Sequence, residues 1–247
     1  MPAFPGATSV SALEVYDGVA PDGLAGGTPH VHLVSAEAYL VVGGRGRLHT
    51  IDGARTFAER ALAPGDVVWF APGVIHRAIN DGGLEVHVIM QNAGLPEAGD
   101  AVMTFPDDVL ADPERYADAA ALPGPEASDA DRLAAAHARR DLAVAGYLAL
   151  FGDDGDDGAV DPDRLGRLHA RAAALVRPRV PDWRARWQAG ALAVARETGH
   201  RLDALERGGD PGLAEARAAE ASVAPAFGMC GRLQRYDTTN DHPEGAR

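Results

Sequence analysis

The sequence contains no lysine, and all 23 basic residues of the 247-residue chain are arginines. Without lysine, the protein cannot form a lysine Schiff base, use a lysine general base, or hold a nucleotide phosphate with a Walker-type lysine. Acidic residues outnumber the arginines, and the formal net charge is -13. We therefore expect no nucleic-acid partner and no attraction to an anionic lipid surface.

Cysteine is nearly absent too, because Cys230 is the single one in the chain. An internal disulfide and a zinc site built from cysteines are therefore excluded. No segment approaches the roughly 18 uninterrupted apolar residues of a membrane span. The first residues show neither the basic start nor the apolar run of a signal peptide. We therefore expect a cytoplasmic protein with no membrane partner.

The chain divides into two parts with different patterns. Residues 1–105 hold short strand-like runs between glycine- and proline-rich turns, which is typical of a β-sandwich or small barrel. Residues 106–247 are rich in alanine, arginine and acidic residues, and their spacing predicts helices over 128–151, 161–176 and 181–209. Residues 228–240 look non-helical, and we expect them to return to the β domain as an extra strand.

Two features of the second part have alternative interpretations. The apolar stripe of the helix predicted over 181–209, which includes Trp183, Trp187, Leu202 and Leu205, is interpreted as core. Its alternatives are a ligand-binding face and the surface of a homodimer, the oligomeric state that we expect. The run GDDGDDG at 152–158 lacks the ligand spacing of an EF-hand and is interpreted as an exposed acidic loop.

The segment TPHVHLVSAE, residues 28–37, carries the first functional signal. His30 and His32 stand two apart, and alternate residues of a strand point to the same side. Glu37 has the wrong parity for that face on one continuous strand, so a turn at 33–36 is required to bring it there. His76 follows a second turn at Pro72-Gly73 and supplies a fourth group. Three imidazoles and a carboxylate suit a divalent metal such as Fe, Mn, Ni, Co or Zn.

These residues resemble the two motifs of the cupins, a superfamily of small jelly-roll barrels. The first motif, G(x)5HxH(x)3-4E(x)6G, is matched by His30, His32, Glu37 and Gly44, whereas Leu24 occupies the place of its leading glycine. The second, G(x)5PxG(x)2H(x)3N, is matched at four positions, although alanine stands where its proline is expected. The matching positions are Gly65, Gly73, His76 and Asn80.

The resemblance covers roughly residues 20–92, and all four metal positions of the family are occupied. It implies a cupin-like double-stranded β-helix, or jelly-roll barrel, for the β region. The predicted helices lie outside the resemblance, so we expect a protein that is mainly β with an α-helical C-terminal part, the barrel being followed by about three to four helices. The resemblance also implies one bound divalent metal ion, iron being our preferred choice.

The sequence NDGG at 80–83 is typical of a two-residue hairpin turn. That register would place His76 directly opposite His87, so His87 would face the metal and handle protons. The alternative for His87 is a packing role. Tyr39 shares parity with Glu37, and it is interpreted either as a proton donor near the metal or as a packing residue.

Four further residues are candidates for the substrate pocket. Gln91 has the parity of His87, and one of Trp69 and Phe70 is expected to line the barrel. Arg47 and His49 lie on the second strand of a predicted hairpin with a glycine-rich turn at 43–46, and an inward arginine would favour an anionic substrate.

The cupin resemblance implies a metal site and leaves the reaction open. Our preferred hypothesis is a non-heme iron dioxygenase, or a related oxygenase, that acts on a small molecule. One alternative is a redox-neutral isomerase, epimerase or lyase of a sugar or hydroxy acid, with the metal as a Lewis acid. The other is a non-catalytic protein that binds a small ligand.

Overall fold

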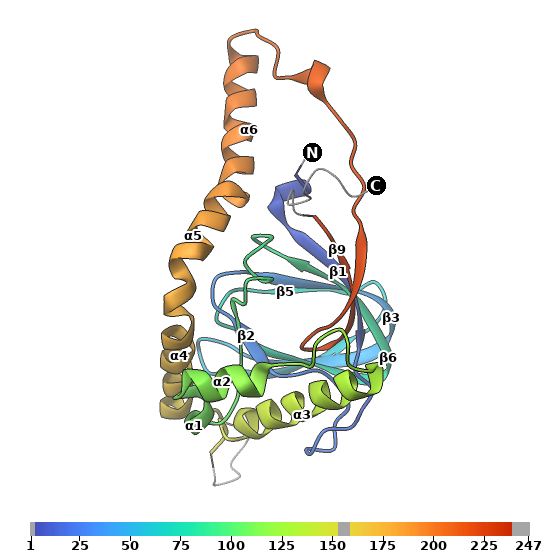
Figure 1. Ribbon diagram of the computed structural model, residues 1–247, viewed down its shortest axis with the longest axis vertical. Coiled ribbons are helices and arrows are strands. Elements are labelled where there is room, and N and C mark those ends of the chain that lie inside the picture. The colour runs from blue at the N-terminus through green and yellow to red at the C-terminus, as the bar shows by residue number, and fades with distance from the viewer. Residues whose placement is uncertain (1–2, 153–158, 239–247) are drawn as a thin grey trace.

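The computed structural model describes residues 3–152 and 159–238 (Figure 1). Most of the run GDDGDDG therefore lies outside the described residues. The strands within the described part are β1 (Ser9–Val15), β2 (His30–His32), β3 (Glu37–Ile51), β4 (Phe57–Leu62), β5 (Val67–Phe70), β6 (Ile75–Met90), β7 (Ala101–Met103), β8 (Val223–Phe227) and β9 (Gly231–Tyr236).

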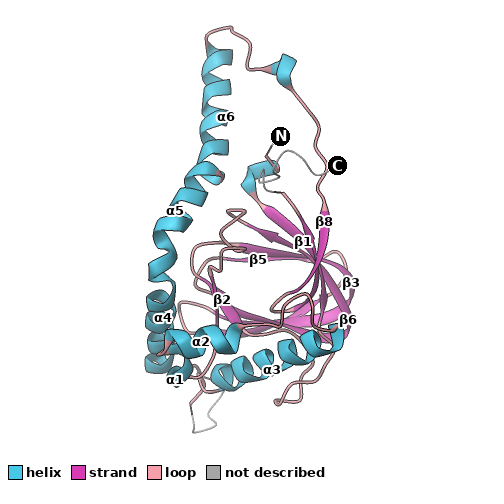
Figure 2. Ribbon diagram, in the orientation of Figure 1, coloured by secondary structure: helices cyan, strands magenta, loops and turns pink. Residues whose placement is uncertain are grey.

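These strands form one antiparallel sheet that curls into a barrel-like shape (Figure 2). Along its main path the order is β4-β3-β6-β1-β9-β8, while β2 pairs with β6 and β7, and β5 pairs with β3. The helices follow the first seven strands in the chain. The expected mainly-β region followed by a helical region is therefore confirmed.

The two expected hairpin turns are wrong, because β3 and β6 each continue without a chain reversal through their glycine-rich segment. The amide oxygen of Asn80 accepts the N–H groups of Gly82 and Leu84, each at 3.0 Å, and so stabilises an irregularity inside β6. Opposite it, Gly44 has φ 65°, and a Cβ there would lie 1.9 Å from the carbonyl oxygen of Gly83. The two segments thus bend together as paired bulges.

The predicted pairing of His76 with His87 is wrong for the same reason. His76 pairs with Thr50 of β3 and His30 of β2. His87 lies further along the same strand, where its partner on β3 is Leu40. The chain never reverses between the two histidines, so they do not face each other.

The helices of the described residues cover one side of the sheet and then extend away from it (Figure 1). Four of them have ten residues or more. They are α1 (Asp107–Leu110), α2 (Pro113–Ala120), α3 (Asp129–Leu148), α4 (Pro162–Val176), α5 (Val180–Ala189) and α6 (Ala191–Glu206); the 3-10 turns are η1 (Pro5–Ala7), η2 (Arg177–Arg179) and η3 (Leu213–Glu215).

The single helix predicted over 181–209 is wrong, because Gly190, with φ -96° and ψ -99°, separates α5 from α6. Trp183 of α5 is buried, as expected for a core position. Leu202 and Leu205 of α6 are 62% and 57% exposed, so the expected core role is wrong for them. The homodimer stays a prediction. No helix among the described residues is long and apolar enough to cross a membrane.

An apolar core joins the helices to the barrel. It includes Val31 and Phe105 on the barrel side, and Tyr147, Leu168 and Trp183 on the helical side. Each such buried side chain contributes about 1.5–3 kcal/mol relative to an exposed one. The helical region therefore holds the β2 and β7 side of the barrel in place.

A buried arginine side chain also fixes the helical region to the barrel. Arg140 of α3 is 1% exposed, and its guanidinium donates to the carbonyl oxygens of Gly18, Val19 and Gly26. Because these carbonyls precede β2, α3 determines where the strand with the first two histidines begins.

After α6 the chain returns to the barrel, and β9 lies beside β1 (Figure 1). This strand falls within the range 228–240 where a returning strand was expected. The turn between β8 and β9 is fixed at both sides. The carbonyl oxygen of Gly228 accepts hydrogen bonds from Arg139 at 2.8 Å and from the Tyr16 hydroxyl at 3.1 Å, and the Thr28 N–H donates to Met229 O at 3.0 Å.

Candidate metal centre

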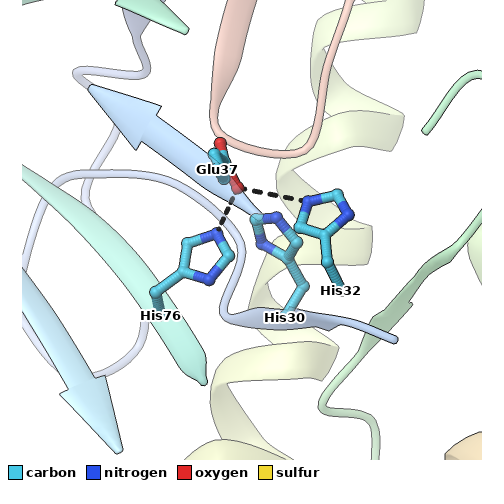
Figure 3. A group of neighbouring side chains, drawn as sticks. All are labelled: His30, His32, Glu37 and His76. Atoms are coloured by element: carbon cyan, nitrogen blue, oxygen red, sulfur yellow. Dashed lines mark ion pairs between the residues drawn. The ribbon is translucent and has the colours of Figure 1, made fainter. Parts of the chain in front are cut away.

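Four buried side chains from three strands converge at one point (Figure 3). His30 and His32 extend from the same side of β2, Glu37 is the first residue of β3, and His76 lies on β6 directly opposite His30. Their potential ligand atoms all lie within 4.8 Å of one another. The four residues predicted as metal ligands are thus brought together.

Backbone carbonyls orient two of the histidines. Nδ1 of His30 lies 2.9 Å from Thr28 O, and Nδ1 of His76 lies 3.2 Å from Val74 O. A carbonyl oxygen can only accept, so each Nδ1 carries a proton, and Nε2 is the atom that each ring offers to a metal. Burial, together with the charges of the neighbouring histidines, lowers the pKa of His30 well below its ordinary value and keeps its ring neutral. Neutral imidazoles with a free Nε2 are what a metal ion requires.

A carboxylate orients the third histidine. Nδ1 of His32 donates to Oδ1 of Asp100 at 2.6 Å, and Asp100 is fully buried just before β7. Burial alone would lower the pKa of His32, but Asp100 and Glu37 outweigh it and raise the pKa to about 10. Carboxylate–histidine pairs of this kind commonly support metal-binding histidines, because they fix the tautomer and increase ligand basicity.

The buried polar atoms at the centre of the cluster fit a cation. Oε2 of Glu37 lies 3.0 Å from Nε2 of His76 and 3.2 Å from Nε2 of His32. Neither Oε2 of Glu37 nor Nε2 of His76 has a hydrogen-bond partner, a costly arrangement for buried groups unless a metal satisfies them. Burial would raise the pKa of Glu37, but His76 and His32 hold it well below its usual range, so the carboxylate is charged. The residues present therefore fit one divalent metal ion.

The cluster opens into a cavity of about 530 Å³, which we call the metal pocket. His30, His32, Glu37 and Tyr39 line it from the barrel, and Met229, Leu233 and Arg235 are among the residues that line it from the C-terminal segment. The volume is in the range of pockets that hold small molecules. The C-terminal strands therefore form a wall of the site.

Tyr39 lines the metal pocket, as its parity with Glu37 predicts. Its hydroxyl lies 4.0 Å from Sγ of Cys230. Burial, with the negative charge of Glu37 as a smaller contribution, raises the pKa of Tyr39 well above 10 and that of Cys230 to about 12. Both groups therefore stay protonated and are able to donate hydrogen bonds inside the pocket.

His87, the residue expected to handle protons, is not at this site. It is half-buried and lies on the opposite face of β6 from the buried Val86 and Val88. It lines a separate cavity, together with Glu85 and Arg232. The structure therefore separates His87 from the metal ligands.

The four candidate pocket residues also lie elsewhere. Trp69 is 76% exposed, whereas its neighbour Phe70 is buried with its ring centroid 4.1 Å from that of His76, so Phe70 is the residue that faces the barrel. Gln91 is exposed, and its side chain accepts the N–H of Ala36.

Arg47 and His49 take part in a charged network near the surface. Both contact Oε2 of Glu59 at 2.7 Å, and Arg47 also forms an ion pair with Asp81 at 2.8 Å. Neither residue lines the metal pocket. The expected inward arginine is therefore not Arg47.

Sequence reasoning missed Asp100, Cys230 and Arg235. Asp100 reaches His32 because β7 pairs with β2, and the other two line the pocket because β9 pairs with β1. The expected returning strand at 228–240 could have indicated that Cys230 and Arg235 lie near the site. No sequence pattern around Asp100 indicates that it contacts His32.

One comparison with known protein families matches the β region. Residues 18–91 match the family model of the cupin domain. No curated protein matches the chain. Among solved structures, a cupin 2 conserved barrel domain protein from Salinispora arenicola is 27% identical, and the match covers 40% of this chain and 76% of that one with a TM-score of 0.28.

Two further structures show the range of these matches. A protein with a double-stranded β-helix domain from Klebsiella pneumoniae is 19% identical, with 35% of this chain and 69% of that one covered and a TM-score of 0.28. An oxalate oxidase solved with glycolate is 15% identical, with 35% of this chain covered and a TM-score of 0.26. This chain spans about half, 51%, of that oxidase.

Proposed function

Since residues 18–91 match the cupin domain, we propose that the protein is a mononuclear non-heme iron enzyme that oxygenates a small molecule. The observation that carries the proposal is the convergence of three imidazoles and one charged carboxylate at one point, where His30, His32 and Glu37 also line a 530 Å³ pocket. Four protein ligands leave open positions on an octahedral ion. A bound ferrous ion would supply the electrons for dioxygen chemistry at those positions.

The residues of the chain have separate tasks in this proposal. His30, His32, Glu37 and His76 hold the ion, and the single charge of Glu37 offsets part of the charge of a divalent cation. Asp100 fixes the orientation of His32 through its short hydrogen bond. The protein thereby presents a preformed site, and little reorganisation is needed when the ion binds.

Tyr39 is the hydrogen-bond donor of the proposal. Its hydroxyl lines the metal pocket, and it stays protonated at physiological pH because its pKa is raised by burial. The apolar side chains of Val88 and Met90 line the same pocket and limit the access of water.

The redox-neutral alternative is less well supported, because its expected base His87 lies outside the metal pocket. Tyr39 and Cys230 line the pocket but remain protonated, so neither is a base at neutral pH. Glu97 also lines it, and its carboxylate accepts the N–H of Gly94 at 2.7 Å. Glu97 is therefore the base that this alternative would use, and the position of His87 outside the pocket is the observation that places it second to oxygenation.

Oxygen uptake tests the proposal. Protein loaded anaerobically with ferrous ion is mixed with a panel of small carboxylates and then with isotopically labelled dioxygen, and uptake and labelled products are measured. We expect uptake with at least one member of the panel, and none with H76A, which lacks a ligand. The proposal is refuted if iron-loaded protein consumes no oxygen with any member, or if H76A consumes it equally well.

A further inference from the structure

Arg235 lines the metal pocket from a strand that lies outside the cupin domain. The sheet register shows how it gets there. Tyr39 pairs with Val88, Val88 pairs with Ser11, and Ser11 pairs with Arg235, in one row across β3, β6, β1 and β9. Directly paired residues of neighbouring strands share a face of the sheet. Arg235 therefore belongs to the same inner face as Tyr39, next to the metal ligands.

The strand that carries Arg235 is held in a fixed position. β9 pairs with β1 from Val10 to Val15, and Leu233, on the same face as Arg235, packs against the core inside the barrel. The N–H of Tyr16 also donates to Cys230 O at 3.1 Å, just before β9 begins. Arg235 is thus presented by a rigid element and not by a loop.

The side chain of Arg235 has no ion pair or hydrogen bond to any described residue, although 36 acidic residues outnumber the 23 arginines of the chain. Other arginines of the barrel are occupied, as in the pairs Arg47–Asp81 and Arg232–Asp129. No other arginine lines the metal pocket within the described part of the chain. Its guanidinium is therefore available to a ligand in the pocket.

Two carboxylates limit which anion fits. Glu97 and Asp237 line the same pocket, so its charge is not generally positive. A group with two negative charges, such as a phosphate monoester, would meet repulsion from both. A single carboxylate matches the planar fork of the guanidinium and adds only one charge.

The wall between Arg235 and the ligands is mainly apolar, with Ser11 as the polar residue of the row. Val88, Leu13 and Leu233 line the pocket between the two ends of the row. Three strand spacings separate Tyr39 from Arg235, which is about 14 Å measured along the sheet. Because both side chains extend into the pocket, a ligand needs to span less than this distance.

We propose that Arg235 binds the carboxylate of the substrate. The apolar body of the substrate then lies against Leu13, Val88 and Leu233, and the end of the substrate opposite the carboxylate faces the metal ligands. The substrate class is thus an amphipathic monocarboxylic acid. For turnover this rests on the proposed oxygenase function, but carboxylate binding does not require turnover. Arg235 acts here as a specificity-determining residue supplied by β9.

The test measures ligand binding to full-length protein loaded with Zn²⁺, a metal that performs no redox chemistry. The probes are hexanoate, its neutral analogue hexanamide, and hexyl phosphate, each titrated calorimetrically. The variant is R235Q, and R232Q is the matched control. Arg232 lies on the same strand and the substitution removes the same charge, but its side chain lines the other cavity with His87.

We expect hexanoate to bind wild-type protein at least tenfold more tightly than either other probe. R235Q should weaken hexanoate binding about tenfold. This is the lower end of the range for a hydrogen bond to a charged group, because Arg235 is exposed and solvent weakens its interactions. R232Q should change it less than twofold. Circular dichroism and zinc content show that both variants remain folded and loaded.

Three results would overturn the proposal: no binding of hexanoate, tighter binding of hexyl phosphate, or hexanoate binding that R235Q leaves unchanged. In the last case the carboxylate would bind elsewhere, for instance at the metal itself. Failure of the oxygenase function is separate, since it appears as absent oxygen uptake while hexanoate binding still depends on Arg235.

Discussion

Replacement of Asp100 should weaken metal binding although Asp100 is not a ligand. Its carboxylate is fully buried and accepts the Nδ1–H of His32 at 2.6 Å. Without this acceptor the imidazole loses the contact that directs Nε2 toward Glu37. The asparagine variant D100N keeps an acceptor oxygen of similar shape but removes the charge, whereas D100A removes both.

The magnitude follows from the role of such supporting carboxylates. Loss of a group that orients a metal-bound histidine typically costs about 10–100-fold in metal affinity. We expect D100N near the lower limit, roughly 1.4 kcal/mol, and D100A near the upper limit, roughly 2.8 kcal/mol. The order of the two variants is as informative as the values. If Asp100 acted only through its shape, D100N would leave the metal affinity unchanged.

The assay is a competition titration of Zn²⁺ between the protein and a chelator of known affinity. Leu168→Ala is the control for general destabilisation, because Leu168 is buried in α4 and belongs to the core between helices and barrel. That variant should lose about 2–5 kcal/mol of stability and keep its metal affinity while folded. Unchanged affinity in folded D100A would refute the assigned role of Asp100.

Three further predictions concern pH, Tyr39 and His87. Because the pKa of His32 is raised from 6.5 to about 10, Nε2 must lose a proton before it binds a metal, and zinc affinity should rise about tenfold per pH unit across that window; a flat profile would contradict this. The same shift stabilises the metal-free fold fully below pH 6.5, so its melting temperature should fall as pH rises toward 10, apart from other titrations. Tyr39→Phe should retain the metal but lower kcat at least a hundredfold with an accepted substrate, whereas an unaffected kcat would assign Tyr39 to packing. His87→Ala should leave zinc affinity and oxygen uptake within twofold of wild type, and a loss of either would place His87 in the site after all.

The ligand set could be predicted because it depends on local geometry. The spacing of His30 and His32 on a strand places them on one face whatever the rest of the fold does. The positions of Glu37 and His76 followed from the motif spacing of the cupin resemblance. These are short-range or motif-level constraints, and the structure brings all four residues together.

The predictions of hairpin turns failed because glycine-rich segments were interpreted locally, whereas the structure uses them to pair two distant strands. The glycines at 43–46 and 80–83 are typical of hairpin turns, yet they face each other across β3 and β6 and form paired bulges. Nothing local distinguishes the two cases, because both need positive φ. Since His87 was placed by that turn, the error moved it to the wrong face of β6.

The wall of the pocket could not be predicted for a related reason. Arg235 and Cys230 reach the site through the pairing of β9 with β1, two strands about 220 residues apart in the chain. Asp100 likewise depends on the pairing of β7 with β2. Each pairing joins segments that are far apart in the chain, so no short stretch of sequence encodes it.

The most direct test of the account is a crystal structure of the metal-loaded protein, with the ion identified by anomalous scattering at its absorption edge. We predict one ion per chain, bound by Nε2 of His30, His32 and His76 and by the carboxylate of Glu37. The account would be contradicted by a loaded crystal in which this position holds no ion, or in which the ion is bound by other residues.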